Sequence, residues 1–300
     1  MDASLVIGTP IERLALYFSA TRTRQGVLAR SALGVPAAGD AALADELAAE
    51  MSAELRADGS VGAAAVPTIW RAHELLDLGR RPDHPAVILT LGWLLERQGL
   101  PGAYGQGCDK TRHAKRVCEH ALGGFFAPAQ PTERLAPITL PNGKVYRSEP
   151  AARFAISCLG LRAALRAGLG HRPGIVQHLD SLRGLAAQWK SWTGPFAPDM
   201  IVAGLHALAL GGRQYQESVV TLADLVAAHQ APDGLWPNAD LFPTLEALLA
   251  SGLPAAHAAV RRAVPPLVER QRVDGTLGPT AQQERALIGL RALLWAETTP

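Results

Sequence analysis

The sequence has few aromatic residues, few cysteines and no long apolar run. Three cysteines, an odd number in 300 residues, argue against a disulfide framework. No stretch approaches the roughly 18 uninterrupted apolar residues that a membrane span needs. The N-terminus lacks a basic start and has an acidic second residue, Asp2, which is atypical of a signal peptide. We therefore expect a cytoplasmic protein without a membrane span.

The chain also lacks an excess of charge of either sign. Its formal net charge is +2, and its positive residues are mostly arginines scattered along the sequence. Such a pattern gives no basic footprint for nucleic acid, so nucleic acid is not an expected partner. Apolar residues are abundant instead: 48% of the chain is hydrophobic, with Ala and Leu dominating. This composition is typical of a helical protein.

A short motif recurs along the chain. Residues 230–236 read QAPDGLW, and related segments occupy 98–104, 271–277 and, more loosely, 54–60 and 188–196. Each has a Gln or Glu at the end of an amphipathic run, then a turn built on glycine. Gly194, Gly234 and Gly275 follow one another at intervals of 40 and 41 residues, and Gly59 and Gly102 are 43 apart. A fixed period of this size indicates a repeat architecture, which forms one continuous core.

The segments between the turns have the periodicity of helices. The expected helical runs are 10–24, 40–56, 67–79, 84–98, 151–168, 175–190, 198–212, 215–230, 239–252, 255–271 and 280–295. One β-hairpin is expected at Ile138–Tyr146, because Asn142-Gly143 suits a tight turn. The surrounding segment, 123–149, is rich in proline and has no helical period, so it reads as an irregular insertion in a single domain spanning 1–300.

Gln230, Gly234 and Trp236 match the Gln-x3-Gly-x-Trp motif of squalene and oxidosqualene cyclases. The chain therefore resembles the α/α toroid shared by those terpene cyclases and by protein prenyltransferases. The resemblance implies an all-α fold of about five to six helical hairpins, with a central apolar cavity opening where the inner helices begin. Conformation alone also explains the motif: Gln can bond free carbonyls at the helix end, and Gly permits a left-handed turn.

The resemblance also suggests an acid. In such cyclases a proton comes from an Asp-rich motif where an inner helix begins, and the similar segment here is Pro237-Asn238-Ala239-Asp240. Asp240 is thus the candidate proton donor, and Asp199 occupies the equivalent place one repeat earlier; the two could act as a pair. The alternative is that Asp240 caps its helix. The motif's other carboxylates are absent here.

A second cluster holds thiol and imidazole groups, which are common zinc ligands. It comprises Cys108, His113, Cys118 and His120. Prenyltransferases hold zinc with Asp, Cys and His, but the spacing here matches no standard finger, and a solvated or core role is the alternative. Zinc is the one cofactor that the sequence suggests.

Several polar or aromatic residues occur in runs that would line a central cavity. The candidates for ligand binding are Trp70, His73, Glu119, His120, Arg153, His206 and Glu246. Arg153 could neutralise an anion such as a diphosphate or carboxylate, or pair only with Glu149. A histidine such as His206 on an apolar face is more often a satisfied core residue than an acid or base.

Three functions follow. The first is a terpene-cyclase-like or prenyltransferase-like enzyme that binds an isoprenoid or similar apolar ligand, with acid-initiated cyclisation as one form of it. Aromatic residues make up only 5% of the chain, a small supply for stabilising carbocations. The second is a non-catalytic toroid that binds a lipid, peptide or protein partner. The third is a zinc enzyme using the Cys108 to His120 cluster. An apolar cavity lined by aromatics would favour the first, and a polar centre the second.

Overall fold

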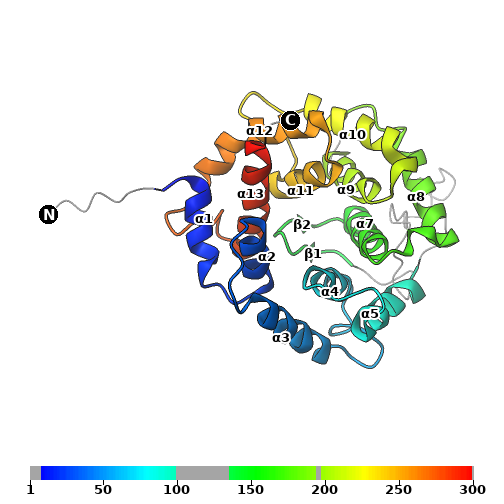
Figure 1. Cartoon of the computed structure of the whole chain (residues 1–300). Helices are drawn as coiled ribbons and strands as arrows, with labels where there is room; N and C mark the ends of the chain where they lie inside the picture. The colour runs from blue at the N-terminus through cyan, green and yellow to red at the C-terminus, as the bar shows by residue number, and fades with distance from the viewer. Residues whose placement is uncertain (1–7, 99–134, 194–196, 299–300) are drawn as a thin grey trace.

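The structure is a computed structural model that describes residues 8–98, 135–193 and 197–298. Its helices form two concentric rings, which confirms the all-α toroid (Figure 1). The inner ring comprises α2 (Arg24–Ala32), α4 (Ala65–Asp77), α7 (Glu149–Arg166), α9 (Ala197–Ala209), α11 (Leu241–Ser251) and α13 (Gln282–Glu297). The outer ring comprises α1 (Pro10–Ser19), α3 (Asp40–Ala53), α5 (Pro85–Glu96), α8 (Pro173–Ala186), α10 (Gln216–Ala228) and α12 (Pro254–Glu269).

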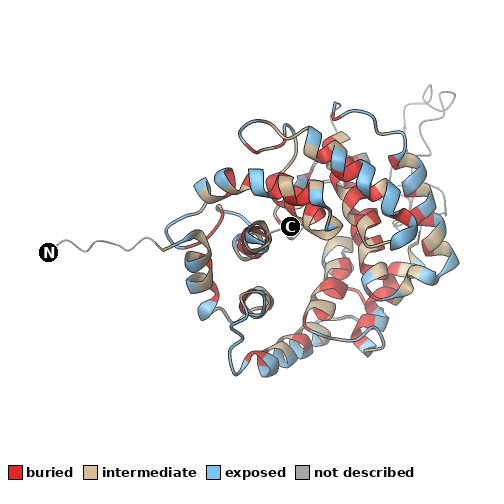
Figure 2. Cartoon of the chain, turned by 45° about the horizontal axis from the view of Figure 1, so that its top comes forward, coloured by how far each residue is buried: buried red, intermediate tan, exposed pale blue. Residues whose placement is uncertain are grey.

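The inner ring is closed. Going round it, α4 packs on α7, α7 on α9, α9 on α11, α11 on α13, and α13 on α2, which returns to α4. Outer helices pack against these, and buried residues lie where the two rings face one another (Figure 2). Small and branched residues fill this layer; Leu205, Leu245 and Leu290, for example, are fully buried. The hydrophobic core is therefore a cylinder between the rings rather than a mass at the centre.

The first expected helical run, 10–24, is divided in the structure. Helix α1 ends at Ser19, and the side chain of Thr23 begins α2 by accepting a hydrogen bond from the backbone N–H of Gly26 at 3.3 Å. The sequence pattern did not identify α2, because its buried residues include Arg24 and Arg30 and few apolar residues. Arg30 is buried against Asp40 and donates to the backbone oxygen of Phe18 at 2.6 Å.

The turn after outer helix α10 contacts the next outer helix, α12. The side-chain amide of Gln230 donates to the carbonyl oxygens of Gly234, at 2.8 Å, and Ala259 on α12, at 2.9 Å. Its oxygen accepts from Arg262 Nε at 2.8 Å. The indole N–H of Trp236 donates to the last turn of α10. These contacts confirm the conformational explanation of the motif.

The same turn closes the ring between the two ends of the described chain. Gln271 donates to the carbonyl oxygen of Pro10 at 3.0 Å and accepts from Arg13 Nε at 2.9 Å, as Gln230 does with Ala259 and Arg262. In these two turns the motif therefore joins consecutive outer helices, including across the seam between α12 and α1.

The expected β-hairpin is present and lies inside the ring (Figure 1). Strands β1 (Ile138–Thr139) and β2 (Val145–Tyr146) pair antiparallel, with Ile138 opposite Tyr146. Its tip repeats the backbone bonds of the other turns: Leu140 N–H donates to Lys144 O, as Ala231 N–H donates to Leu235 O. The tip reaches across to α13, where Arg285 Nε donates to Asn142 O at 2.9 Å.

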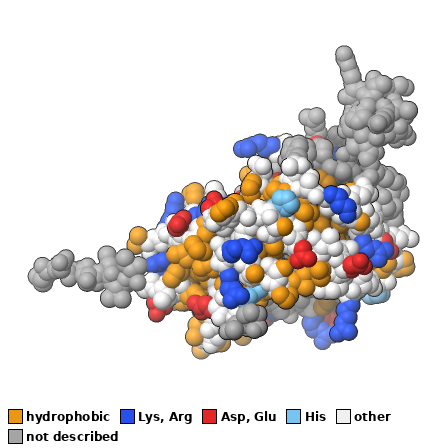
Figure 3. Space-filling model, turned by 90° about the horizontal axis from the view of Figure 1, so that it is seen from above, with side chains coloured by type: hydrophobic (Ala, Val, Ile, Leu, Met, Phe, Trp, Pro, Cys, Tyr) orange, Lys and Arg blue, Asp and Glu red, His pale blue; other side chains and the backbone are white. Residues whose placement is uncertain are grey.

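One face of the molecule carries charges of both signs. On the face seen in Figure 3, basic and acidic side chains are interspersed among apolar ones. Across residues 8–98, 135–193 and 197–298, no helix has the length and apolar character needed to cross a membrane.

Candidate functional site

The centre of the inner ring contains a cavity of about 320 Å³. Every inner helix contributes to its wall, which comprises Arg24, Trp70, Asp77, Arg162, Arg166, His206, Leu210, Glu246, Leu249, Ala250, Glu284, Ile288 and Arg291. Ligand pockets range from about 300 to 1,000 Å³, so this one suits a small ligand or one part of a larger one. The wall is strongly charged, which corrects the expectation of an apolar cavity.

The cavity lies toward the ends of α4, α7 and α11, and Arg24 and Glu284 reach it from the first turns of α2 and α13. Asp77 and Arg166 are the last residues of α4 and α7, and Ala250 is in the last turn of α11. We expected the opening where these helices begin. The hairpin tip occupies that end instead: Asn142 and Lys144 bind residues of α11, α13 and α9 there.

Four inner helices present a polar side chain to the cavity from the same local sequence, Leu-x-Ala. The segments are Leu161-Arg162-Ala163, Leu205-His206-Ala207, Leu245-Glu246-Ala247 and Leu290-Arg291-Ala292. In each, the Leu and the Ala are fully buried, and the residue between them lines the cavity. Successive helical residues differ in direction by about 100°. The flanking residues therefore pack within the ring while the middle one faces its centre.

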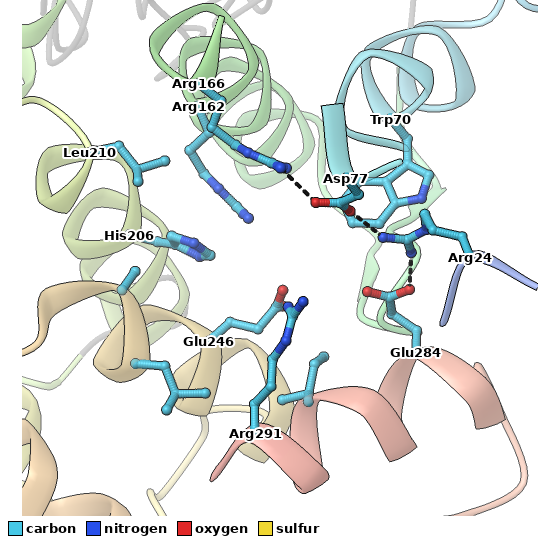
Figure 4. A pocket seen from close by; sticks show the side chains of 13 residues that line it. Arg24, Trp70, Asp77, Arg162, Arg166, His206, Leu210, Glu246, Glu284 and Arg291 are labelled. Carbon is cyan, nitrogen blue, oxygen red and sulfur yellow. Dashed lines mark hydrogen bonds and ion pairs between the residues drawn. The ribbon is translucent and has the colours of Figure 1, made fainter. Parts of the chain in front are cut away.

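One part of the wall is an ion-pair network. Arg24, only 3% exposed, bridges Asp77 of α4 and Glu284 of α13 (Figure 4). Arg166 donates to the other oxygen of Asp77 at 2.5 Å, and Gln25 donates to Glu284 at 2.9 Å. Burial alone would lower the pKa of Arg24, but the carboxylates of Glu284 and Asp77 raise it above its usual value. Arg24 therefore stays charged and joins the first inner helix to the last.

Two other arginines of the wall have no such partner. Within the described part of the chain, neither Arg162 nor Arg291 has a carboxylate within 4.0 Å. The Nε of Arg162 is buried and lacks a hydrogen-bond partner among those residues. Burial lowers the pKa of Arg162, partly offset by the charge of Glu246. Figure 4 shows both guanidinium groups pointing into the cavity, with His206 beside Arg162.

Glu246 lies between this cavity and the hairpin. Its Oε2 accepts a hydrogen bond from Asn142 Nδ2 at 2.8 Å, and burial raises the pKa of its carboxyl. On the hairpin side it lines a second chamber of about 30 Å³, whose other polar groups include Tyr146, Arg162 and His206. That volume suffices for one or two water molecules at most. Glu246 therefore lines both the central cavity and the second chamber.

His73, a predicted site residue, is fully buried behind the wall. Arg166 Nη1 lies 3.0 Å from His73 Nδ1, and Leu159 O lies 3.1 Å from Nε2. A guanidinium only donates, so Nδ1 must accept and Nε2 must carry the hydrogen. Burial and the nearby charges of Arg162 and Arg166 hold the pKa of His73 well below its usual value. His73 is therefore a neutral support for Arg166.

This burial predicts a pH dependence. A histidine that is neutral when folded contributes stability above its unfolded pKa of about 6.5, and this is lost as pH falls, by up to about 1.4 kcal/mol per pH unit. The pKa values of Glu74, Asp199 and Glu246 are raised in the folded chain. These three carboxyls therefore add stability as pH falls toward 5, which opposes the effect of the histidine.

The contribution of His73 to the pH dependence of stability is therefore measured by comparing variants. We expect the unfolding free energy of His73→Gln, relative to the native chain, to improve by about 1 kcal/mol between pH 7.0 and 5.5, measured by urea denaturation. His171 is exposed, so the unfolding free energy of His171→Gln should change with pH as that of the native chain does. If the unfolding free energy of His73→Gln has the same pH dependence as that of the native chain, His73 is not neutral in the folded state.

The two predicted catalytic carboxylates lie at the hairpin end. Asp199 binds Lys144 Nζ at 2.7 Å, and burial raises the pKa of Asp199, with the charge of Asp240 adding to this. Asp240 is the N-cap of α11: it accepts from Phe242 N–H at 3.1 Å and lies 3.6 Å from Arg285 Nη2. The structure thus brings the two residues near one another, as anchors of the hairpin and helix. Neither lines the central cavity.

The other predicted residues are placed as follows. Trp70 lines the cavity and lies under Arg24, whose guanidinium carbon is 5.1 Å from the ring centroid. His206 and Glu246 line it too. Arg153 pairs with Glu149 at 2.6 Å. Glu119 and the zinc candidates Cys108, His113, Cys118 and His120 lie outside the described residues. Within the described ranges, no group of three His, Cys, Asp or Glu side chains could hold a metal ion.

Sequence reasoning missed several of the charged wall residues. These are Arg24, Asp77, Arg162, Arg166, Glu284 and Arg291. Two of them could have been found from the Leu-x-Ala sequence. Arg162 and Arg291 are the middle residues of such segments, as His206 and Glu246 are, so the same inward direction is expected for all four. Arg24, Asp77 and Glu284 carry no such signal: each is a common charged residue at a helix end, and only the closed ring brings them together.

Comparison with solved structures identifies the same architecture in a known enzyme. A variant of the type II terpene cyclase MstE from Scytonema, in complex with its substrate geranylgeranyl dihydroxybenzoate, is 14% identical over 97% of both chains, with a TM-score of 0.58. A second variant, bound to its product merosterolic acid A, is 14% identical over 97% of this chain and 96% of that one, with a TM-score of 0.57. At this identity the likeness shows the fold alone.

An apo form of MstE gives 13% identity over 97% of this chain and 95% of that one, with a TM-score of 0.54. No family model matches the sequence, and no curated protein matches it significantly.

Proposed function

We propose that this chain binds an amphipathic isoprenoid ligand, with the anionic head held by Arg162, Arg166 and Arg291 in the central cavity. The observation that carries the proposal is Arg162, whose buried Nε has no hydrogen-bond partner in the described structure and whose guanidinium points into the cavity without a carboxylate partner there. A buried, unpaired charge is costly to the fold. An anionic ligand would supply the missing hydrogen bonds and charge.

The charges of the wall favour an anion over a neutral ligand. Arg24, Arg162, Arg166 and Arg291 face the three carboxylates of Asp77, Glu246 and Glu284. Burial holds the pKa of His206 well below its usual value, so His206 is neutral. The wall then carries one net positive charge. In a cavity of low dielectric such an excess attracts an anion strongly. It also disfavours a carbocation at the same place.

The apolar part of the wall supports an apolar tail. Leu210, Leu249 and Ile288 are apolar residues of the wall, and Figure 4 shows Leu210 on the side away from Arg24. A ligand with an acidic head and a hydrocarbon chain would contact both sides. MstE, whose fold this chain shares, binds geranylgeranyl dihydroxybenzoate, an isoprenoid chain joined to a benzoate. This likeness of fold supports an isoprenoid tail over other apolar groups.

Calorimetric titration with farnesyl diphosphate and farnesol tests the proposal. We expect the native chain to bind farnesyl diphosphate and to bind farnesol far more weakly. Arg162→Met should weaken farnesyl diphosphate binding about 30-fold, because a buried charge-assisted contact is worth about 2 kcal/mol or more. The same variant should be at least as stable as the native chain, since it removes an unpaired buried charge.

Arg261→Met is the matched control, because Arg261 is exposed on the outer helix α12; its affinity should be unchanged. Equal binding by Arg162→Met and Arg261→Met would contradict the proposal. A loss of binding that accompanies a loss of stability would point to a structural arginine instead.

Acid-initiated cyclisation is a second candidate, favoured by one observation: burial raises the pKa of Asp199, beside Asp240. Product analysis of the same titration samples separates it from simple binding. Asp240→Asn should keep full binding, since Asn also caps helices and Asp240 does not line the cavity. A cyclised product formed by the native chain and lost in Asp240→Asn would support the acid role. Binding without any product would support the non-catalytic toroid.

A further inference from the structure

We propose that Glu246 sets the charge of the ligand: it restricts the cavity to heads with a single negative charge, such as a carboxylate, and admits a diphosphate only together with a proton. This inference rests on the proposed function, because it concerns the same cavity. It goes beyond that function by naming the class of head group and the residue that selects it.

The position of Glu246 makes it part of the anion site. It extends from the middle of α11 beside Arg291, and Figure 4 shows the two side chains together in the cavity. Unlike Asp77 and Glu284, it has no arginine within 4.0 Å in the described structure, and its hydrogen bond comes from the neutral amide of Asn142. Its charge is thus available to compete with a ligand for Arg162 and Arg291.

The titratable groups that face Glu246 come from the hairpin and from α7, α9 and α13. They are Tyr146 on the hairpin, Cys158 and Arg162 on α7, His206 on α9, and Glu284 and Arg291 on α13. Two cations and one carboxylate among them nearly balance the charge of Glu246. An incoming anion shifts this balance toward negative charge.

Counting charges shows what the cavity accepts. With Glu246 ionised the wall carries one net positive charge, which a carboxylate head neutralises. A diphosphate head would leave an excess of negative charge in a space of low dielectric, where one uncompensated unit charge changes affinity by tenfold or more. Protonation of Glu246 removes one of these charges. Burial already raises the pKa of Glu246, so the proton, taken from solvent, is acquired readily when an anion binds nearby.

Glu246→Gln removes the charge and keeps the shape. Its amide oxygen can still accept from Asn142, so the hairpin contact is preserved. Farnesoate and farnesyl diphosphate share a tail and differ in head charge, which makes them the two probes. Titration calorimetry gives the ratio of their affinities. We expect the native chain to favour farnesoate, and Glu246→Gln to shift the ratio toward farnesyl diphosphate by at least tenfold. The control Glu269→Gln, exposed at the end of α12, should not shift it.

Proton uptake provides a second readout that does not need the variant to fold. Titrations of the native chain in two buffers of different ionisation enthalpy should show about one proton taken up per farnesyl diphosphate bound and none per farnesoate. Glu246→Gln should abolish the uptake; uptake that persists in it would overturn the assignment to Glu246. An unchanged affinity ratio with binding intact would overturn this inference and leave the proposed function standing. Binding of neither probe by the native chain would overturn both.

Discussion

Replacing Arg24 by Met should destabilise the fold by about 3–5 kcal/mol, the usual cost of leaving buried charges without their partner. Arg24 is the common partner of Asp77 and Glu284, and its side chain is 3% exposed. Without it, Asp77 keeps Arg166 and Glu284 keeps only the amide of Gln25. The first and last inner helices would lose the ion pair between them and keep the hydrogen bond from Gln25 to Glu284. Urea denaturation at pH 7 measures the change.

The control is Arg22→Met, two residues earlier. Arg22 pairs with Glu46 at 3.0 Å, but both side chains are more than half exposed, so its loss should cost less than about 1 kcal/mol. The double variant Arg24→Met with Glu284→Gln should recover part of the stability, because it removes one of the unpaired carboxylates. Similar losses for Arg22→Met and Arg24→Met would contradict a closing role for Arg24.

The fold was largely predictable because its repeated turns are determined locally. The Gln230 and Gln271 amides make equivalent bonds in two turns, and Gly234 and Gly275 have positive φ in both. A local requirement of this kind leaves a mark at a fixed sequence spacing. Helix α2 was not predictable in this way, because hydrophobic periodicity assumes an apolar inward face. The buried residues of α2 include Arg24 and Arg30, whose charges are satisfied by carboxylates of other helices.

The site was predictable only in part, for a related reason. His206 and Glu246 stand out because a lone polar residue is unusual in an apolar run. An inward arginine such as Arg162 looks like a solvated one until the ring is closed. The hairpin could be placed in the chain from Asn142-Gly143, but its direction could not be inferred. Its tip has the same turn as the others and is distinguished by its contacts with Glu246, Arg285 and Asp199.

Replacing Gly234 by Ala should cost about 3 kcal/mol, and it tests whether the repeated turn must touch the next outer helix. Gly234 has a φ of +81°, and a Cβ there would lie 2.2 Å from the carbonyl oxygen of Arg262. The left-handed conformation alone costs a non-glycine residue roughly 1–2 kcal/mol. The overlap with backbone adds to this, because α12 would have to move away and stretch the bond from Gln230 to Ala259 O.

Gly252→Ala separates the two contributions. Gly252 also has a positive φ, +63°, at the end of α11, but a Cβ there meets nothing within 4 Å. It should therefore lose only the conformational part, about 1 kcal/mol. A difference of about 2 kcal/mol between the variants, measured by urea denaturation, would attribute the excess to the contact with Arg262. Equal losses would mean that the turn and α12 can separate freely, and that Gly234 is present only for its conformation.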